Sequence, residues 1–111
     1  MKPKQRDLFP GALEVMIHHT LRASGRLHGY ALVQEIKHRS ELEIEEGSLY
    51  PALQRMLRAG LLQAEWTTSA TNRRIRQYRL TVAGRRYLER EVSSIERMFR
   101  AVTRVLASAE D

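Results

Sequence analysis

Two adjoining stretches of the chain decide the fold: GSLYPALQRMLRAG at residues 47–60 and LQAEWTTSATNRRIRQYRL at residues 62–80. In the first stretch apolar residues recur at spacings of three and four, which predicts a helix with one buried face. Proline is tolerated only near the start of a helix, so Pro51 places that start near residues 46–48. Gly60 followed by an apolar residue predicts the end of the helix. The apolar stripe consists of Leu49, Leu53, Met56 and Leu57.

The second stretch changes from a helical period to a period of two, which is typical of strands. Residues 62–68 and 74–81 alternate on either side of a polar turn at residues 69–72, so we predict a β-hairpin. We expect Trp66 to pack the hairpin against the core, and the lining of an apolar ligand pocket is its alternative role. The tip of the hairpin carries Arg73, Arg74 and Arg76.

The flanking sequence predicts three further helices. The first helix has one apolar face and ends near Gly25. A second helix begins at residues 27–30 and is followed by an acidic patch at residues 41–46. After the hairpin, Thr81 is a good N-cap for a helix over residues 82–107, about 39 Å long. Its apolar residues step by 4, 3, 4, 3 and 4, a heptad seam that needs a partner beyond its own domain. The seam consists of Leu88, Val92, Ile95, Phe99, Val102 and Leu106.

This order of elements predicts a mostly helical α+β fold, the winged helix-turn-helix. In that fold the later helix of a pair enters the major groove of DNA and the hairpin forms a wing. We assign residues 8–81 to a DNA-binding domain and residues 82–107 to a dimerisation helix. Because a fold does not fix a function, a small α+β domain without a nucleic-acid role is the alternative.

Composition and charge narrow the classes of function. The chain has 111 residues and no cysteine, which excludes disulfide scaffolds, thiolate metal sites and thiol nucleophiles. The net charge is +6, and residues 66–88 hold six arginines and no acidic residue, while the basic and acidic residues elsewhere balance. Arginine pairs two phosphate oxygens at once, so an exposed arginine hairpin favours a phosphate-bearing partner. A solvated basic loop is the alternative.

The outward face of the helix near residues 47–60 carries groups that can read DNA. Gln54 and Arg55 can bond to base edges, and Ser48 lies where free amides at a helix start bind phosphate. Tyr50, at the edge of this face, either donates its hydroxyl to phosphate or is a core-edge aromatic. Arg55 has the acidic patch as its alternative partner. The candidate DNA-binding residues are Ser48, Tyr50, Pro51, Gln54, Arg55, Arg58, Arg73, Arg74 and Arg76.

No catalytic or metal-binding constellation is expected. His18 and His19 point about 100° apart on a helix, His28 is interpreted as a cap or turn residue, and His38 stands alone. The sequence has neither a glycine-rich phosphate loop nor a G-x-S-x-G motif, so we expect no enzyme activity and no cofactor. We find no targeting segment and no apolar run that could span a membrane, which favours a cytoplasmic protein.

Four motifs are specific in combination and together cover about residues 10–88. They are LHGYAL at residues 27–32, GSLYPALQRM at residues 47–56, GLL at residues 60–62 followed by Trp66, and YRLT at residues 78–81 followed by Gly84. Together they resemble the PadR family of bacterial transcriptional regulators. The resemblance implies a homodimeric winged-helix repressor whose single C-terminal helix, as in the short subclass, packs on the first helix of the other subunit. Family effectors are diverse and include phenolic acids and drugs, so the resemblance allows for a small-molecule effector.

The resemblance also implies roles for individual residues. It places Ser48, Tyr50, Pro51 and Arg55 on the DNA-reading helix and Arg73, Arg74 and Arg76 on the wing. The family's wing pattern is similar to G-R-P-R-K-Y-Y-x-L-T. Residues 72–81 depart from it, because they lack the glycine and the proline and have Gln77 in place of an aromatic. The positive charge of the wing remains.

We therefore expect a sequence-specific DNA-binding regulator, a homodimeric repressor on an inverted-repeat operator of double-stranded DNA. A winged-helix module that binds a protein and never touches DNA is the alternative. A basic dimer on an anionic membrane surface is disfavoured, because the arginines lie on a hairpin and not on the polar side of an amphipathic helix.

Overall fold

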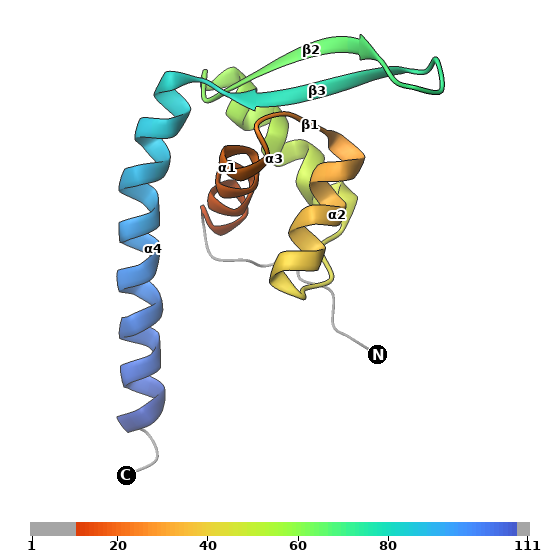
Figure 1. Ribbon diagram of the computed structural model, residues 1–111. Coiled ribbons are helices and arrows are strands. Elements are labelled where there is room, and N and C mark those ends of the chain that lie inside the picture. Colours follow the sequence, from red (N-terminus) through yellow and green to blue (C-terminus); the bar gives the residue numbers. More distant parts are fainter. Residues whose placement is uncertain (1–10, 109–111) are drawn as a thin grey trace.

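The computed structural model describes residues 11–108. Within them the chain forms a winged helix-turn-helix of four helices and a three-stranded antiparallel sheet of order β1-β3-β2 (Figure 1). The elements are α1 (Ala12–Ser24), β1 (Leu27–His28), α2 (Gly29–Ser40), α3 (Glu46–Arg58), β2 (Leu62–Thr68), β3 (Arg74–Leu80) and α4 (Val82–Ser108). The predicted fold class is confirmed. The predicted domain start at residue 8 lies outside the described residues.

The core lies where α1, α2 and α3 meet the base of the sheet. The predicted apolar stripe of α3 is confirmed, since Leu49, Leu53 and Met56 are almost fully buried and Leu57 packs against them. Ile44 is also buried and ties the linker between α2 and α3 to the core. The buried cluster comprises Leu13, Ile17, Leu21, Leu32, Val33, Ile36, Ile44, Leu49, Ala52, Leu53, Met56, Leu62 and Tyr78.

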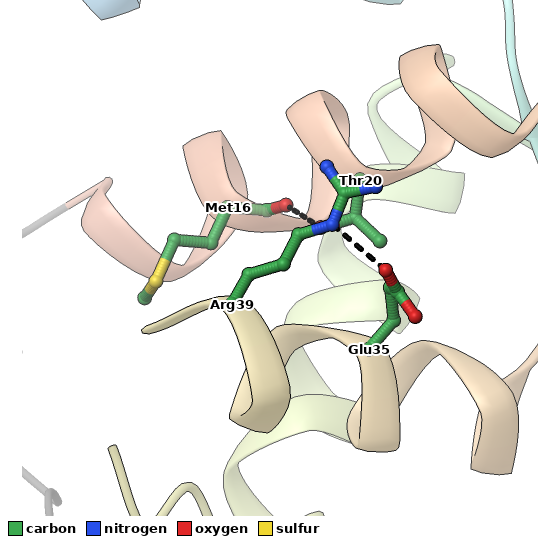
Figure 2. A network of polar contacts seen from close by, with 4 residues as sticks. All are labelled: Met16, Thr20, Glu35 and Arg39. Carbon is green, nitrogen blue, oxygen red and sulfur yellow. Dashed lines mark hydrogen bonds and ion pairs between the residues drawn. The ribbon is translucent and has the colours of Figure 1, made fainter. Parts of the chain in front are cut away.

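Two side-chain hydrogen bonds, one on α1 and one on α2, each lie within a single helix. Thr20, buried on α1, donates from Oγ1 to the carbonyl oxygen of Met16 at 2.7 Å. On α2, Nε of Arg39 donates to Oε1 of Glu35 at 2.8 Å. Figure 2 shows both bonds, with Arg39 extending from α2 toward α1. Neither bond crosses between the helices, so their packing depends on the apolar core.

The second helix begins later than the sequence predicts. The helical start expected at residues 27–30 is partly wrong, because Leu27 and His28 form β1, which pairs antiparallel with β3. The helix α2 begins at Gly29, and His28 caps it by accepting a hydrogen bond from the amide of Ala31 on Nδ1, as interpreted from the sequence. A strand of two residues is too short to show a periodic pattern. Its partner strand β3 also lies about 50 residues farther along the chain, so neighbouring residues do not reveal the pairing.

The turn after α3 is fastened to the start of α4. As predicted, α3 ends in a Schellman motif, with Gly60 at φ +76° and the amide of Leu61 bonded to the carbonyl of Met56 at 2.9 Å. The hydroxyl of Thr81 donates to the carbonyl of Gly60 at 2.7 Å and accepts from the amide of Gly84 at 2.9 Å. Thr81 is therefore confirmed as the N-cap of α4.

Gly84 allows the backbones to meet closely at this joint. A Cβ atom at Gly84 would lie 2.1 Å from the carbonyl oxygen of Leu61, so only glycine fits while the backbone stays in place. The end of α3, the base of the wing and the start of α4 thus meet at one point. Beyond it, α4 runs past α1 and away from the other helices (Figure 1). Of its residues, Gly84 and Leu88 are buried.

Replacing Gly84 should disrupt this joint. We expect Gly84→Ala to lower the free energy of unfolding by about 3 kcal/mol, because the added methyl group displaces a backbone carbonyl. Gly47→Ala is the matched control, since a Cβ atom at exposed Gly47 meets nothing within 4 Å, and it should be neutral or slightly stabilising. Denaturant unfolding at one fixed chain concentration measures both variants. Equal stabilities would contradict the proposed constraint.

A buried histidine lies between α1 and α4. His18 has no exposed surface, its Nδ1 donates to the carbonyl oxygen of Glu14 at 2.7 Å, and its ring centre is 5.6 Å from that of Tyr87 on α4. No group within residues 11–108 bonds to its Nε2. Burial lowers the pKa of His18, and this outweighs the opposing effects of the bond to Glu14 and of the Glu14 charge. The ring is therefore neutral in the folded protein at neutral pH.

The lowered pKa makes stability depend on pH in a defined direction. Because the unfolded chain binds the proton more tightly, stability should fall as the pH decreases below about 6.5, the ordinary histidine value. The slope is at most about 1.4 kcal/mol per pH unit, which corresponds to one proton per chain. His18→Leu should flatten the denaturation profile between about pH 7 and pH 5. A profile that stays equally steep in His18→Leu would contradict the assignment.

Candidate nucleic-acid interface

The exposed face of α3 is the first part of the candidate interface. Pro51, Gln54, Arg55 and Arg58 are exposed and Ser48 is half-buried, all on the side of the helix that faces away from the core. In the part of the chain that the structure describes, the side chains of Gln54 and Arg58 form no hydrogen bond or ion pair, so both are available to a ligand. The predicted outward orientation is confirmed, while the DNA contacts stay predictions.

The start of α3 offers fewer free amides than expected. The amide of Ser48 is bonded to the carbonyl oxygen of Glu45 at 3.0 Å, so the expectation of a free amide at Ser48 is wrong. The physical reason is that the helix begins at Glu46, which places Ser48 inside the first hydrogen-bonded turn. Two glutamates also flank this turn and repel anions. A phosphate can therefore be bound at Ser48 only through the hydroxyl.

Arg55 is held by α1. Its Nη2 donates to Oε1 of Glu14 at 2.7 Å, and the Glu14 side chain is mostly buried while 55% of the Arg55 side chain stays exposed. The acidic patch at residues 41–46, the alternative partner in the sequence analysis, does not form this ion pair. The bond fixes one end of the guanidinium and leaves the rest at the surface of α3. The sequence carried no signal for it, because 41 positions separate the two residues.

Tyr50 combines the two roles that the sequence allows. Its ring packs on Gly29 at the start of α2, where a Cβ atom would come within 2.9 Å of Cε1 of the ring. Nevertheless 40% of its surface is exposed. Burial raises the pKa of Tyr50, and the proximity of Glu46 and Tyr78 raises it further, so the hydroxyl stays protonated and can donate a hydrogen bond.

The wing is a hairpin, and one of its two sides packs on the core at the base but is exposed toward the tip. The strand register places opposite pairs on this side: Leu62 with Leu80, Ala64 with Tyr78, Trp66 with Arg76, and Thr68 with Arg74. The first two pairs pack on the core at the base of the wing. The hairpin then continues past the helices, as its outer end in Figure 1 shows, so the last two pairs lie on a free surface.

The expectation that Trp66 packs the wing against the core is wrong. Its side chain is 57% exposed, because the strand has passed the edge of the helices at this residue. The guanidinium carbon of Arg74 lies 4.8 Å from the centre of the Trp66 ring, and that of Arg76 lies 5.9 Å away, both within cation–π range. Arg76 is also 5.8 Å from the ring centre of Tyr78, which connects this group to the base of the wing and toward Tyr50.

Charge is divided unequally between the two sides of the wing. On the outer side, Glu65 pairs with Arg79 at 3.5 Å and with Arg26 at 3.8 Å. The arginines of the tip have no such partner, since no carboxylate within residues 11–108 forms an ion pair with them: Arg73, Arg74 and Arg76. The wing therefore presents one neutralised side and one positive side, and the positive side suits an anionic polymer.

The described residues were also compared with the requirements of a membrane-spanning helix and of a metal site. No helix among residues 11–108 is both long enough and apolar enough to pass through a membrane. Over the same residues, histidine and carboxylate side chains do not gather in groups of three that could hold a metal ion.

Comparisons with known proteins agree with this geometry. Residues 17–90 match the model of the transcriptional regulator PadR-like family. The transcriptional regulator Rv3488 of Mycobacterium tuberculosis is 36% identical over 87 residues, which are 78% of each chain. A PadR family transcriptional regulator from Eggerthella lenta has a TM-score of 0.73 at 29% identity, over 87% of this chain and 83% of that one. Bacillus subtilis PadR, solved in complex with operator DNA, has a TM-score of 0.64 at 24% identity, over 73% of this chain and 46% of that one.

The fold and the solved structures define a winged helix-turn-helix protein with a long C-terminal helix. The chain belongs to the PadR-like family of transcriptional regulators, which confirms the resemblance carried by its motifs. The matched region spans α2, α3, the wing and the beginning of α4.

The wing keeps its turn although it departs from the family pattern. Asn72, at the position of the pattern's glycine, adopts φ +62°, and asparagine tolerates this left-handed conformation better than most residues. Ser69 stabilises the turn, because its Oγ accepts from the amide of Arg73 at 3.1 Å. Arg74, at the position of the pattern's proline, adds a cation beside Trp66.

The contact between Gly29 and Tyr50 can be tested by a double-mutant cycle. Gly29→Ala should lower the free energy of unfolding by about 1 kcal/mol, because the ring of Tyr50 must move. In a Tyr50→Ala background the same change should instead raise stability by about 0.5 kcal/mol, since alanine is the better helix former. Thermal and denaturant unfolding measure the four proteins. The same effect of Gly29→Ala in both backgrounds would contradict the contact.

Proposed function

We propose that the protein is a sequence-specific DNA-binding regulator that represses transcription as a homodimer on an inverted-repeat operator. The observation that carries the proposal is the wing, whose outer end extends past the helices (Figure 1) and whose tip arginines have no carboxylate partner among residues 11–108. Membership of the PadR-like family supports the regulatory role. The operator complex of Bacillus subtilis PadR supports DNA as the ligand for a protein of this fold.

Each part of the interface has a role in this proposal. The exposed face of α3 enters the major groove, where Gln54, Arg55 and Arg58 bond to base edges or phosphates. Ser48 and Tyr50 contribute hydroxyl groups, and Pro51 packs at the surface of the groove. The wing contacts the sugar–phosphate backbone through Arg73, Arg74 and Arg76.

Dimerisation through α4 accounts for the apolar surface of this helix. It has 27 residues, and Met98, Val105 and Leu106 are each more than half exposed. Water disfavours such a surface on a single chain, and a second copy would cover it. Leu88 is already buried within its own chain and offers no surface to another. The seam of the proposed dimer is formed by the remaining predicted residues, Val92, Ile95, Phe99, Val102 and Leu106.

In a dimer held through α4, the two copies of α3 are a fixed distance apart, and this distance selects the spacing of the half-sites. A small-molecule effector would act by changing that distance. The proposal includes a cytoplasmic location, where the chromosome of a bacterium is accessible, and assigns the protein no catalytic step.

Selection of bound duplexes from a random-sequence pool tests the proposal. The expected result is enrichment of a palindromic site that binds two chains, as measured by sedimentation of the complex. A winged-helix module for protein partners would enrich no sequence, and its binding to its partner would be insensitive to salt. A pool without an enriched site would overturn the proposal.

The wing arginines should act mainly through charge. Arg76→Ala should weaken binding of the dimer to every duplex by about a hundredfold, because each of the two subunits loses a charged hydrogen bond to phosphate, about tenfold apiece. The slope of log K against log salt should fall by about 0.9 for each phosphate contact, and so by nearly two for a dimer. Arg79→Ala is the matched control on the neutralised side of the same strand. Electrophoretic shifts over a salt series measure both variants. Equal losses of duplex affinity in Arg76→Ala and Arg79→Ala would contradict the unequal distribution of charge between the two sides of the wing.

A further inference from the structure

We propose that Trp66 is a DNA-contacting residue of the wing, which holds Arg74 and Arg76 in place and lies against the sugar–phosphate backbone together with them. The inference rests on the proposed function, because it assigns a role within the same interface. Trp66 does not belong to the predicted set of DNA-binding residues, because its place in the sequence predicted a role in packing the hairpin against the core.

Trp66 lies on an exposed part of the wing. An indole is a large apolar group, and 57% of its surface is exposed here, although on the same side of the strand Ala64 is partly buried and Leu62 is buried. Trp66 is therefore not needed to close the core. An aromatic group left in water on a positive surface is typical of nucleic-acid-binding sites, where rings pack on sugars and bases between cations.

Two cations of the wing lie close to the Trp66 ring. Arg74 and Arg76 lie on the same side of β3 at alternate positions, and both guanidinium groups are within 6 Å of the Trp66 ring centre. Two like charges so near each other repel unless a group between them compensates, and the electron-rich face of the indole does so. The ring thereby limits the rotamers of two long side chains before DNA arrives, which reduces the entropy lost on binding.

The indole N–H of Trp66 can donate a hydrogen bond to a ligand. The indole Nε1–H forms no hydrogen bond within residues 11–108. It is a donor only, so it can bond to a phosphate oxygen, and it offers the neighbouring arginines no acceptor that would compete with phosphate. One exposed surface thus presents a neutral donor and two cations to the same backbone.

The chain offers a direct probe, because Trp66 is its single tryptophan. Titration with a short mixed-sequence duplex at low salt should change the intrinsic fluorescence and lower the quenching constant of acrylamide at least twofold. Acrylamide is neutral, so the negative charge of DNA does not by itself exclude it. Unchanged fluorescence and unchanged quenching in a saturated complex would overturn the inference.

Affinity measurements on variants separate the role of the ring from its bulk. Trp66→Leu should weaken duplex binding about tenfold and Trp66→Phe about threefold, since phenylalanine keeps a π face but lacks the N–H. Thr67→Leu, at the next position on the opposite side of the strand, is the control and should bind within twofold of wild type. The melting temperatures of all three should match that of wild type, because Trp66 is outside the core.

The failure of the inference can be distinguished from the failure of the proposed function. If wild type binds the duplex and Trp66→Leu binds equally well, the role of Trp66 is refuted and the proposed function stands. If wild type binds no duplex even at low salt, the proposed function fails, and the role of Trp66 fails with it.

Discussion

The close approach of Gly84 to the carbonyl of Leu61 is the constraint on which the rest of the molecule depends. It brings together the end of α3, the two ends of the wing and the first turn of α4. Thr81 satisfies the polar groups that this approach would otherwise leave unpaired. As a result, the helix that carries the candidate DNA-binding face, the hairpin beside it and the helix that extends away from the core keep fixed directions relative to one another.

Glu14 on α1 takes part in the contacts that connect α1 to α3 and to α4. The carboxylate of Glu14 accepts from Arg55 on α3, and its backbone carbonyl accepts from His18, which packs on Tyr87 of α4. The candidate DNA-binding face of α3 and the proposed dimer helix are therefore attached to the same turn of α1. This short chain of contacts gives the interface on α3 a rigid support that the exposed side of the helix cannot provide.

The chemistry of the wing follows from the two-residue period of its strands and from its length. Alternation sends Glu65 and Arg79 to one side, where they neutralise each other, and Trp66, Arg74 and Arg76 to the other. At the base of the hairpin the second side is covered by the core. Farther out the helices no longer reach it, so the same pattern of side chains changes from a packing surface into a positive, aromatic one.

By itself the sequence determined what depends on local periodicity and caps: the stripe of α3, its end at Gly60, the hairpin, the N-cap at Thr81 and, through its motifs, the family. It also indicated the arginine-rich tip, because charge is a property of composition. Only the tertiary structure decided the strand β1, the partner of Arg55, the bonded amide of Ser48 and the exposure of Trp66. Each of these depends on which distant segments meet and on where the core ends. The spacing of residues that are near in sequence carries no information about either of these properties.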